Sequence, residues 1–376
     1  MKSASRLLAG TVLALALSSA AHAQFYNLAN TNMLAVSGLS YDGSRAVGVN
    51  GDNTPFFMWT AATGVQTGVG DFIGGQATIS ADGKTVGFNG INPASGNREM
   101  ALYNWNTGST TYLGSLGHTS DRSDASSVWA LSGDGKTAVG LGWVSGGNAH
   151  AISATTAGGV VDLGSSVADR STRANAVSYD GSVIGGWQDT NGPWQGSVWK
   201  NGVQTLLTSS DGTFIGAVNG LSADGQWAVG GAYNDMAYRW SAATGVEYIG
   251  AGLYFGDSAV ATAISADGRV IIGTSRSWDT PPAWGAGFVW TAELGLVDLT
   301  QLALSEGIDL EGVTLAIPTT ISGDGQTIAG MGSNGYGFVL HLPNSLVPVP
   351  EPGTMLMMAM GVCALLARRA TKRKDA

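Results

Sequence analysis

Short apolar runs alternate with turn signals along most of the chain, and they recur in a fixed order. Residues 216–250 illustrate the order with the pieces GAVNGLS, QWAVGGAY, MAYRWS and GVEYIG. Successive side chains of a strand point to opposite faces, and short runs bounded by glycine-rich turns are typical of β-strands. This segment therefore predicts four antiparallel strands.

The turn between the first two pieces belongs to a repeat. Ser-x-Asp-Gly begins at Ser40, Ser80, Ser132, Ser178, Ser222, Ser265 and Ser322, with spacings of 40 to 57 residues. Such a period suits a four-stranded propeller blade and is too long for one coil of a two-turn β-helix. The repeat predicts an all-β fold, a seven-bladed β-propeller of four-stranded blades over residues 24–343.

Ring closure is predicted from the two ends of this region. The seventh repeat lacks a fourth strand, because the chain runs from FVLHLP into a proline-rich segment. The segment FYNLA at residues 25–29 matches the fourth-strand pattern and precedes the first repeat. We expect it to complete the last blade, which would cover two otherwise free strand edges.

A large side chain recurs in the third strand of most repeats. The positions are Trp59, Trp105, Trp199, Trp240 and Trp290, with Leu340 in the seventh repeat and no counterpart in the third. A buried ring removes much apolar area from water, so packing between neighbouring blades is the preferred interpretation. A carbohydrate-stacking platform is the alternative.

Composition narrows the class of protein. Of 376 residues, 44% are hydrophobic, 12% are charged and 57 are glycine, which favours a folded chain with many tight turns. Residues 24–350 carry 11 Lys and Arg against 25 Asp and Glu, which argues against nucleic acid or anionic lipid as a partner. The single cysteine, Cys363, lies in the C-terminal tail, so neither disulfides nor a thiol nucleophile is expected in this region.

Both ends carry export signals. Residues 1–23 contain Lys2, Arg6, an apolar stretch and an Ala-His-Ala cleavage site that ends at Ala23, which predicts a secretory signal peptide and cleavage by signal peptidase. A proline-rich linker over 344–352 leads to a hydrophobic helix and basic tail over 353–376. The basic residues would remain cytoplasmic, and the apolar stretch is short for a lasting transmembrane span.

This tail resembles the PEP-CTERM sorting signal of Gram-negative bacteria. Its three parts are Pro350-Glu351-Pro352, the apolar residues 353–367, and a basic end that starts at Arg368 and Arg369. The resemblance implies processing by an exosortase, a membrane-embedded enzyme that removes the tail. It also implies transient anchoring in the inner membrane, followed by a location at the cell surface or outside the cell.

The repeats over residues 25–343 also resemble extracellular HAF-type repeat proteins. That resemblance implies an exported, propeller-like protein without a defined biochemical role. It brings no catalytic residues.

The repeated aspartates are the first candidates for chemistry: Asp42, Asp82, Asp134, Asp180, Asp224, Asp267 and Asp324. Calcium ligation is one interpretation, and kinship with the Asp box of sialidases is another, although glycine follows each aspartate directly and no Trp closes the motif. Because a catalytic site is normally single, we expect turn residues, with glycine at positive φ and Asp or Ser side chains bonding turn amides.

Residues that interrupt the repeat are the better candidates for function. They lie in the connections between blades, which emerge on one rim of the ring, where loops commonly bind ligands. The candidate binding residues are Asp121, Arg122, Asp124, Asp169, Arg170, Arg173, Asp257, Glu306 and Asp309, with His118 and Glu311 nearby.

No hydrolase, zinc or phosphate-loop motif is present, so the sequence predicts a non-catalytic protein without a cofactor or metal. The expected ligand is an extracellular polysaccharide or another envelope component. A secreted glycan-cleaving enzyme with paired carboxylates on the rim is the alternative, and a calcium-stabilised scaffold is a third reading.

Overall fold

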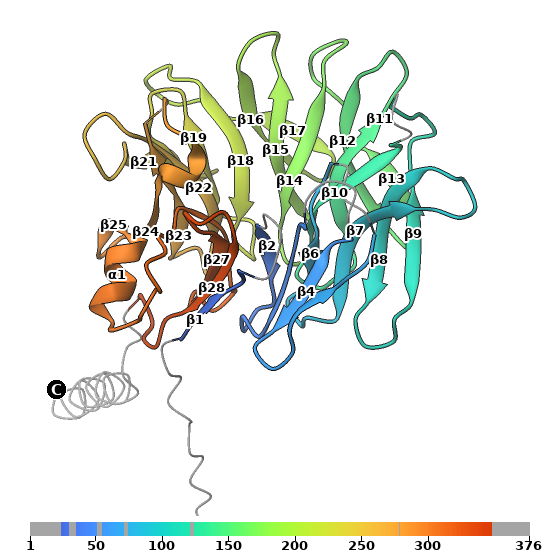
Figure 1. Cartoon of the computed structure of the whole chain (residues 1–376). Coiled ribbons are helices and arrows are strands. Elements are labelled where there is room, and N and C mark those ends of the chain that lie inside the picture. Colours follow the sequence, from blue (N-terminus) through green and yellow to red (C-terminus); the bar gives the residue numbers. More distant parts are fainter. Residues whose placement is uncertain are drawn as a thin grey trace, which may run out of the picture.

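Seven four-stranded antiparallel sheets stand side by side around a central axis (Figure 1). The structure is a computed structural model, and it describes residues 24–29, 35–50, 55–70, 74–120, 124–277 and 279–347. The inner strands of neighbouring sheets contact one another around the whole ring. The predicted seven-bladed propeller is confirmed.

The strands follow the predicted order in each blade, from inner to outer. Blade 1 holds β2 (Val36–Leu39), β3 (Arg45–Gly48), β4 (Phe57–Thr60) and β5 (Gly64–Thr67). Blade 2 holds β6 (Thr78–Ile79), β7 (Thr85–Ile91), β8 (Arg98–Asn104) and β9 (Thr110–Gly114). Blade 3 holds β10 (Ser126–Leu131), β11 (Ala138–Trp143), β12 (Ala149–Thr155) and β13 (Gly159–Asp162). Blade 4 holds β14 (Thr172–Val177), β15 (Val183–Asp189), β16 (Trp194–Lys200) and β17 (Val203–Leu206).

The remaining blades complete the ring. Blade 5 holds β18 (Ile215–Leu221), β19 (Ala228–Ala232), β20 (Ala237–Ser241) and β21 (Gly245–Gly250). Blade 6 holds β22 (Ser258–Ile264), β23 (Ile271–Arg276), β24 (Ala286–Thr291) and β25 (Gly295–Asp298). Blade 7 holds β26 (Ile317–Ile321), β27 (Thr327–Met331), β28 (Gly337–His341) and, as its outer strand, β1 (Gln24–Asn27).

The N-terminal strand closes the ring, as the sequence predicted. β1 pairs antiparallel with β28, and Figure 1 shows the two strands side by side. Phe25 packs near Phe338, and Tyr26 meets Trp59 of blade 1 edge-on with ring centroids 5.0 Å apart. One short strand thus covers the edge of blade 7 and contacts the next blade.

Apolar side chains fill the spaces between adjacent blades, which is where the recurring Trp residues were predicted to pack. Trp59 and Trp199 are buried there, and Trp240 and Trp290 are partly buried against the same kind of cluster. Trp105 also packs between blades, although it lies one residue beyond β8 rather than inside it. Burial of a Trp side chain contributes roughly 2–3 kcal/mol of hydrophobic free energy.

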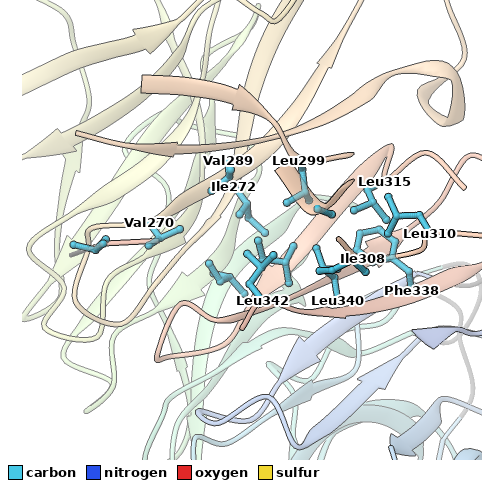
Figure 2. Packing of buried hydrophobic residues seen from close by; sticks show 14 residues of the cluster. Val270, Ile272, Val289, Leu299, Ile308, Leu310, Leu315, Phe338, Leu340 and Leu342 are labelled. Atoms are coloured by element: carbon cyan, nitrogen blue, oxygen red, sulfur yellow. The ribbon is translucent and has the colours of Figure 1, made fainter. Parts of the chain in front are cut away.

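Two short helices were not predicted. They are a 3-10 helix, η1 (Pro282–Trp284), and an α-helix, α1 (Leu299–Ser305). The sequence GLVDLT reads as a strand, but β25 ends at Asp298, whose side chain accepts a hydrogen bond from the Gln301 amide and caps α1. Leu299 and Ala303 then face a large cluster between blades 6 and 7, which Figure 2 shows with Leu310, Leu340 and their neighbours.

Candidate functional site

The seven Ser-x-Asp-Gly turns share one hydrogen-bond pattern. Each serine Oγ donates to the aspartate Oδ1 at 2.5 to 2.8 Å. That Oδ1 accepts the amide two residues later, and the serine Oγ accepts the amide five residues after the serine. The glycines have φ between 65° and 79°. One oxygen of each aspartate, Oδ1, is therefore used within its own turn.

The same turns are joined into a closed circle. Backbone amides donate to carbonyls of the next turn, from Tyr41 to Ala81 and onward until the Asp324 amide donates to the Tyr41 carbonyl at 3.2 Å. The Tyr41 ring lies over Gly323, where a Cβ would stand only 2.1 Å from it. We call this end of the ring the turn face. Its seven turns are connected by a closed circle of backbone hydrogen bonds.

The opposite end carries the connections between blades, and several of its candidate residues have structural partners. Asp124 pairs with Arg98 at 3.0 Å, and both side chains are largely buried. Glu306 ends α1 and accepts a bond from Asn344, whereas Asp309 accepts the amide of Glu311 within a turn.

The candidates of blades 3 and 4 do not form one group. Asp169 has a φ of 55° and borders a cavity beside His150. Arg170 contacts Asn191 and lies 3.7 Å from Asp189. Arg173 was expected in a connection between blades, but it belongs to the inner strand β14, which starts one residue before it, and its guanidinium stacks on Trp129. Asp121 and Arg122 lie outside the described residues.

Exposed aromatic side chains gather on this end, and the sequence analysis did not identify them. They lie in or directly after B–C turns, where the second strand of a blade leads to the third, and in inter-blade connections of blades 4 to 6. This aromatic face consists of Trp194, Phe214, Tyr233, Tyr254, Phe255 and Trp284. Trp284 and Phe255 are 76% and 109% exposed. Exposed apolar surface on a folded protein is typical of interaction sites, so the aromatic face is a candidate binding surface.

A cavity of about 340 Å³ opens within the aromatic face at blade 6. Its wall combines the rings of Tyr254 and Trp284 with the polar side chains of Asp257, Asp298 and Arg276. Of the sequence-predicted rim residues, Asp257 is the one that lines this cavity. The other residues that line this cavity could not be recognised from the sequence as one group, because they come from separate connections of the ring.

Hydrogen bonds hold the polar groups of the cavity in place. The Tyr254 hydroxyl donates to Asp298 Oδ2 at 3.0 Å, which raises the pKa of Tyr254. Ser275 Oγ donates to Asp257 Oδ2 at 2.7 Å. Rigid aromatic rings beside a few fixed polar groups suit a sugar ring, which offers an apolar C–H face and hydroxyls at its edge.

Two larger cavities have no exposed Trp, Tyr or Phe ring among their described lining residues. One of about 700 Å³ lies between β1 and blade 1, lined by Tyr26, Trp59 and Glu311. Another of about 540 Å³ holds His150, whose Nδ1 is 2.9 Å from Asp162. Within the described ranges, no group of three or more His, Cys, Asp or Glu side chains could hold a metal ion.

Comparison with solved structures finds two TolB proteins at low identity. A putative TolB from Agrobacterium tumefaciens is 13% identical, covers 86% of this chain and 97% of its own, and has a TM-score of 0.45. TolB from Acinetobacter baumannii is also 13% identical, covers 82% of this chain and 63% of its own, and has a TM-score of 0.42. No curated protein matches the chain.

The part of the chain that the structure describes contains no helix long and apolar enough to cross a membrane. The predicted signal peptide with Ala23, the residues Pro350, Glu351 and Pro352, and the tail with Arg368 and Arg369 lie outside the described residues. Residues 348–374 match the PEP-CTERM protein-sorting motif, which confirms the sorting tail. The motif is the substrate signal for exosortase-like processing, and it implies an exported protein sorted to the cell envelope.

Proposed function

We propose that this protein is a non-catalytic, envelope-sorted propeller that binds an extracellular polysaccharide through its aromatic face. After removal of the tail, the ring would be released to, or fixed at, the cell surface or the surrounding matrix. The resemblance to HAF-type repeat proteins belongs to the same proposal, since it implies an exported propeller without catalytic residues.

One observation carries the proposal: six exposed aromatic rings lie on one end of blades 4 to 6, and two of them, Tyr254 and Trp284, line a cavity with fixed polar groups. Each such ring would leave water on binding, and large rigid rings dominate the energy of many interfaces. The acidic surface, with a formal net charge of −9 for the whole chain, does not exclude neutral sugars.

The first prediction concerns Trp284. Affinity electrophoresis of the purified protein through gels containing polysaccharide from the producing cells should show retardation. Trp284→Ala should weaken binding by about tenfold, which corresponds to about 1.4 kcal/mol. Tyr41→Ala removes a half-exposed ring from the turn face and is the matched control. Equal retardation of wild type, Trp284→Ala and a Phe255→Ala Trp284→Ala double variant would contradict the proposal.

A second candidate function follows from two carboxylates in the same cavity. Asp257 and Asp298 both line it, and paired acids are the requirement for glycoside hydrolysis. Release of reducing ends from the bound polysaccharide, abolished by Asp257→Asn and by Asp298→Asn, would favour an enzyme. Binding without release would favour the non-catalytic role.

A further inference from the structure

Four planar side chains form a stack where blades 3 and 4 meet. The Arg173 guanidinium carbon lies 3.6 Å from the centroid of the Trp129 ring and 5.3 Å from that of Trp187. Trp187 stacks on Trp194 with centroids 4.3 Å apart and planes 5° apart. Trp194 belongs to the aromatic face, so the stack runs from the inner strands to that surface.

Comparison of equivalent positions in the seven repeats shows that the Arg173–Trp129 pair occurs at one of them. In five blades, the residue three before the repeat serine lies on a β-bulge, and its polar side chain donates to a carbonyl in or next to the inner strand of the next blade. These residues are Ser37, Asn175, Asn219, Thr262 and Thr319, whereas blade 2 has Ala77. Blade 3 has Trp129 at this position. Among the residues five before each repeat serine, only Arg173 is charged.

Two other arginines stack on Trp rings and provide a comparison. Arg45 stacks on Trp105 at 4.9 Å and donates through Nη1 to the Gly83 carbonyl at 2.8 Å. Arg239 lies near two Trp rings and donates through Nε and Nη2 to Glu247 at 2.8 and 2.6 Å. Their guanidinium groups have protein acceptors.

Arg173 differs from both. Its Nε donates to Asn175 Oδ1 at 2.8 Å, and within the described ranges its Nη atoms have no acceptor and no Asp or Glu lies within ion-pair distance. Burial lowers the pKa of Arg173 to about 10, which leaves the side chain charged at neutral pH. A partly buried cation without an anion is costly unless a counter-ion joins it.

We propose that the Nη edge of Arg173 is a binding site for an oxyanion, meaning a carboxylate, sulfate or phosphate group. Stacking on Trp129 uses the face of the guanidinium and leaves its in-plane donors for bidentate contact with two anion oxygens. The anion is either a free ion or a substituent of an acidic glycan. Neutral-sugar binding at the aromatic face does not depend on it.

Isothermal titration calorimetry of the full-length protein tests the site with three probes, glucuronate, sulfate and inorganic phosphate, at constant ionic strength in chloride. We expect saturable binding of at least one probe. Arg173→Gln should weaken it tenfold or more, and Arg173→Lys should weaken it several-fold, because lysine keeps the charge but loses the bidentate fork. Arg45→Gln, which removes a stacked arginine with a protein acceptor, should leave it unchanged.

The outcomes separate the possibilities. Tighter binding of glucuronate than of the inorganic ions supports an acidic glycan, and the reverse order supports a free oxyanion. No saturable binding of any probe to the wild type, or equal binding by a folded Arg173→Gln, overturns the site. If Arg173→Gln does not fold, the Arg173→Lys titration decides. If the anion site is overturned but the protein is still retarded in gels that contain a neutral glycan, the proposed function is unaffected.

Discussion

At the scale of single residues, one hydroxyl organises each turn of the ring. The Ser178 Oγ donates to Asp180 and accepts the buried amide of Val183 at 3.0 Å. Ser182 donates its hydroxyl to the same carboxylate from an exposed position. Ser178 therefore accepts a buried amide, which the exposed Ser182 does not, and Asp180 accepts a hydrogen bond from both serines.

This difference gives the second prediction. Ser178→Ala should lower the free energy of unfolding by about 1–3 kcal/mol, because the buried Val183 amide loses its acceptor. Ser182→Ala should change it by less than about 0.5 kcal/mol, as is usual at surface positions. Urea denaturation monitored by circular dichroism measures both. Similar losses in the two variants would show that the hydroxyl of Ser178 is not what stabilises the turn.

Sequence reasoning worked best where the determinants were local. The Asp-Gly turns and the alternation of small apolar residues predicted the strands around them, and the turn glycines adopt the expected positive φ. It failed for Arg173, because a residue between two strand-like pieces gives no sign that the inner strand starts one position before it. The stack on Trp129 joins residues more than 40 positions apart, so no local pattern could reveal it.

At the scale of elements, closure of the ring depends on one of its short strands, β1. β1 has four residues, yet it pairs with all of Phe338 to His341 and packs against Trp59 of the next blade. Its place was predictable, because the seventh repeat lacked a strand and the N-terminus supplied one. The bulges of the inner strands and the helix α1 were not predictable: a bulge has no fixed sequence sign, and α1 has only seven residues.

The third prediction follows from this closure. Deletion of residues 24–29 should expose the edge of β28, so the protein should unfold at lower urea concentration and self-associate through the free edge. Size-exclusion chromatography with light scattering would detect the oligomers. Gln24→Ala, which changes only an exposed first residue of β1, is the control. A monomeric deletion variant of unchanged stability would show that the ring does not need β1.

At the scale of the whole molecule, the two ends of the ring differ in kind. The turn face is a closed circle of repeated turns, and its exposed aromatic residues are Tyr41 and Tyr179 within the described part. The opposite end varies from blade to blade and carries the aromatic face. The repeat keeps the turns of one end the same in every blade, whereas the loops of the other end can vary in sequence. A rigid ring can therefore carry a specific surface on its variable end. The sorting motif then delivers that surface to the envelope.

The most direct test is hydroxyl-radical footprinting of the purified protein with and without the polysaccharide of its own cells, read by mass spectrometry. It reports on exposed rings of both ends in one measurement. We expect the polysaccharide to protect Tyr254, Phe255 and Trp284 from oxidation while Tyr41 and Tyr179 stay unprotected. Protection of the two tyrosines of the turn face with unchanged oxidation of the aromatic face would contradict this expectation.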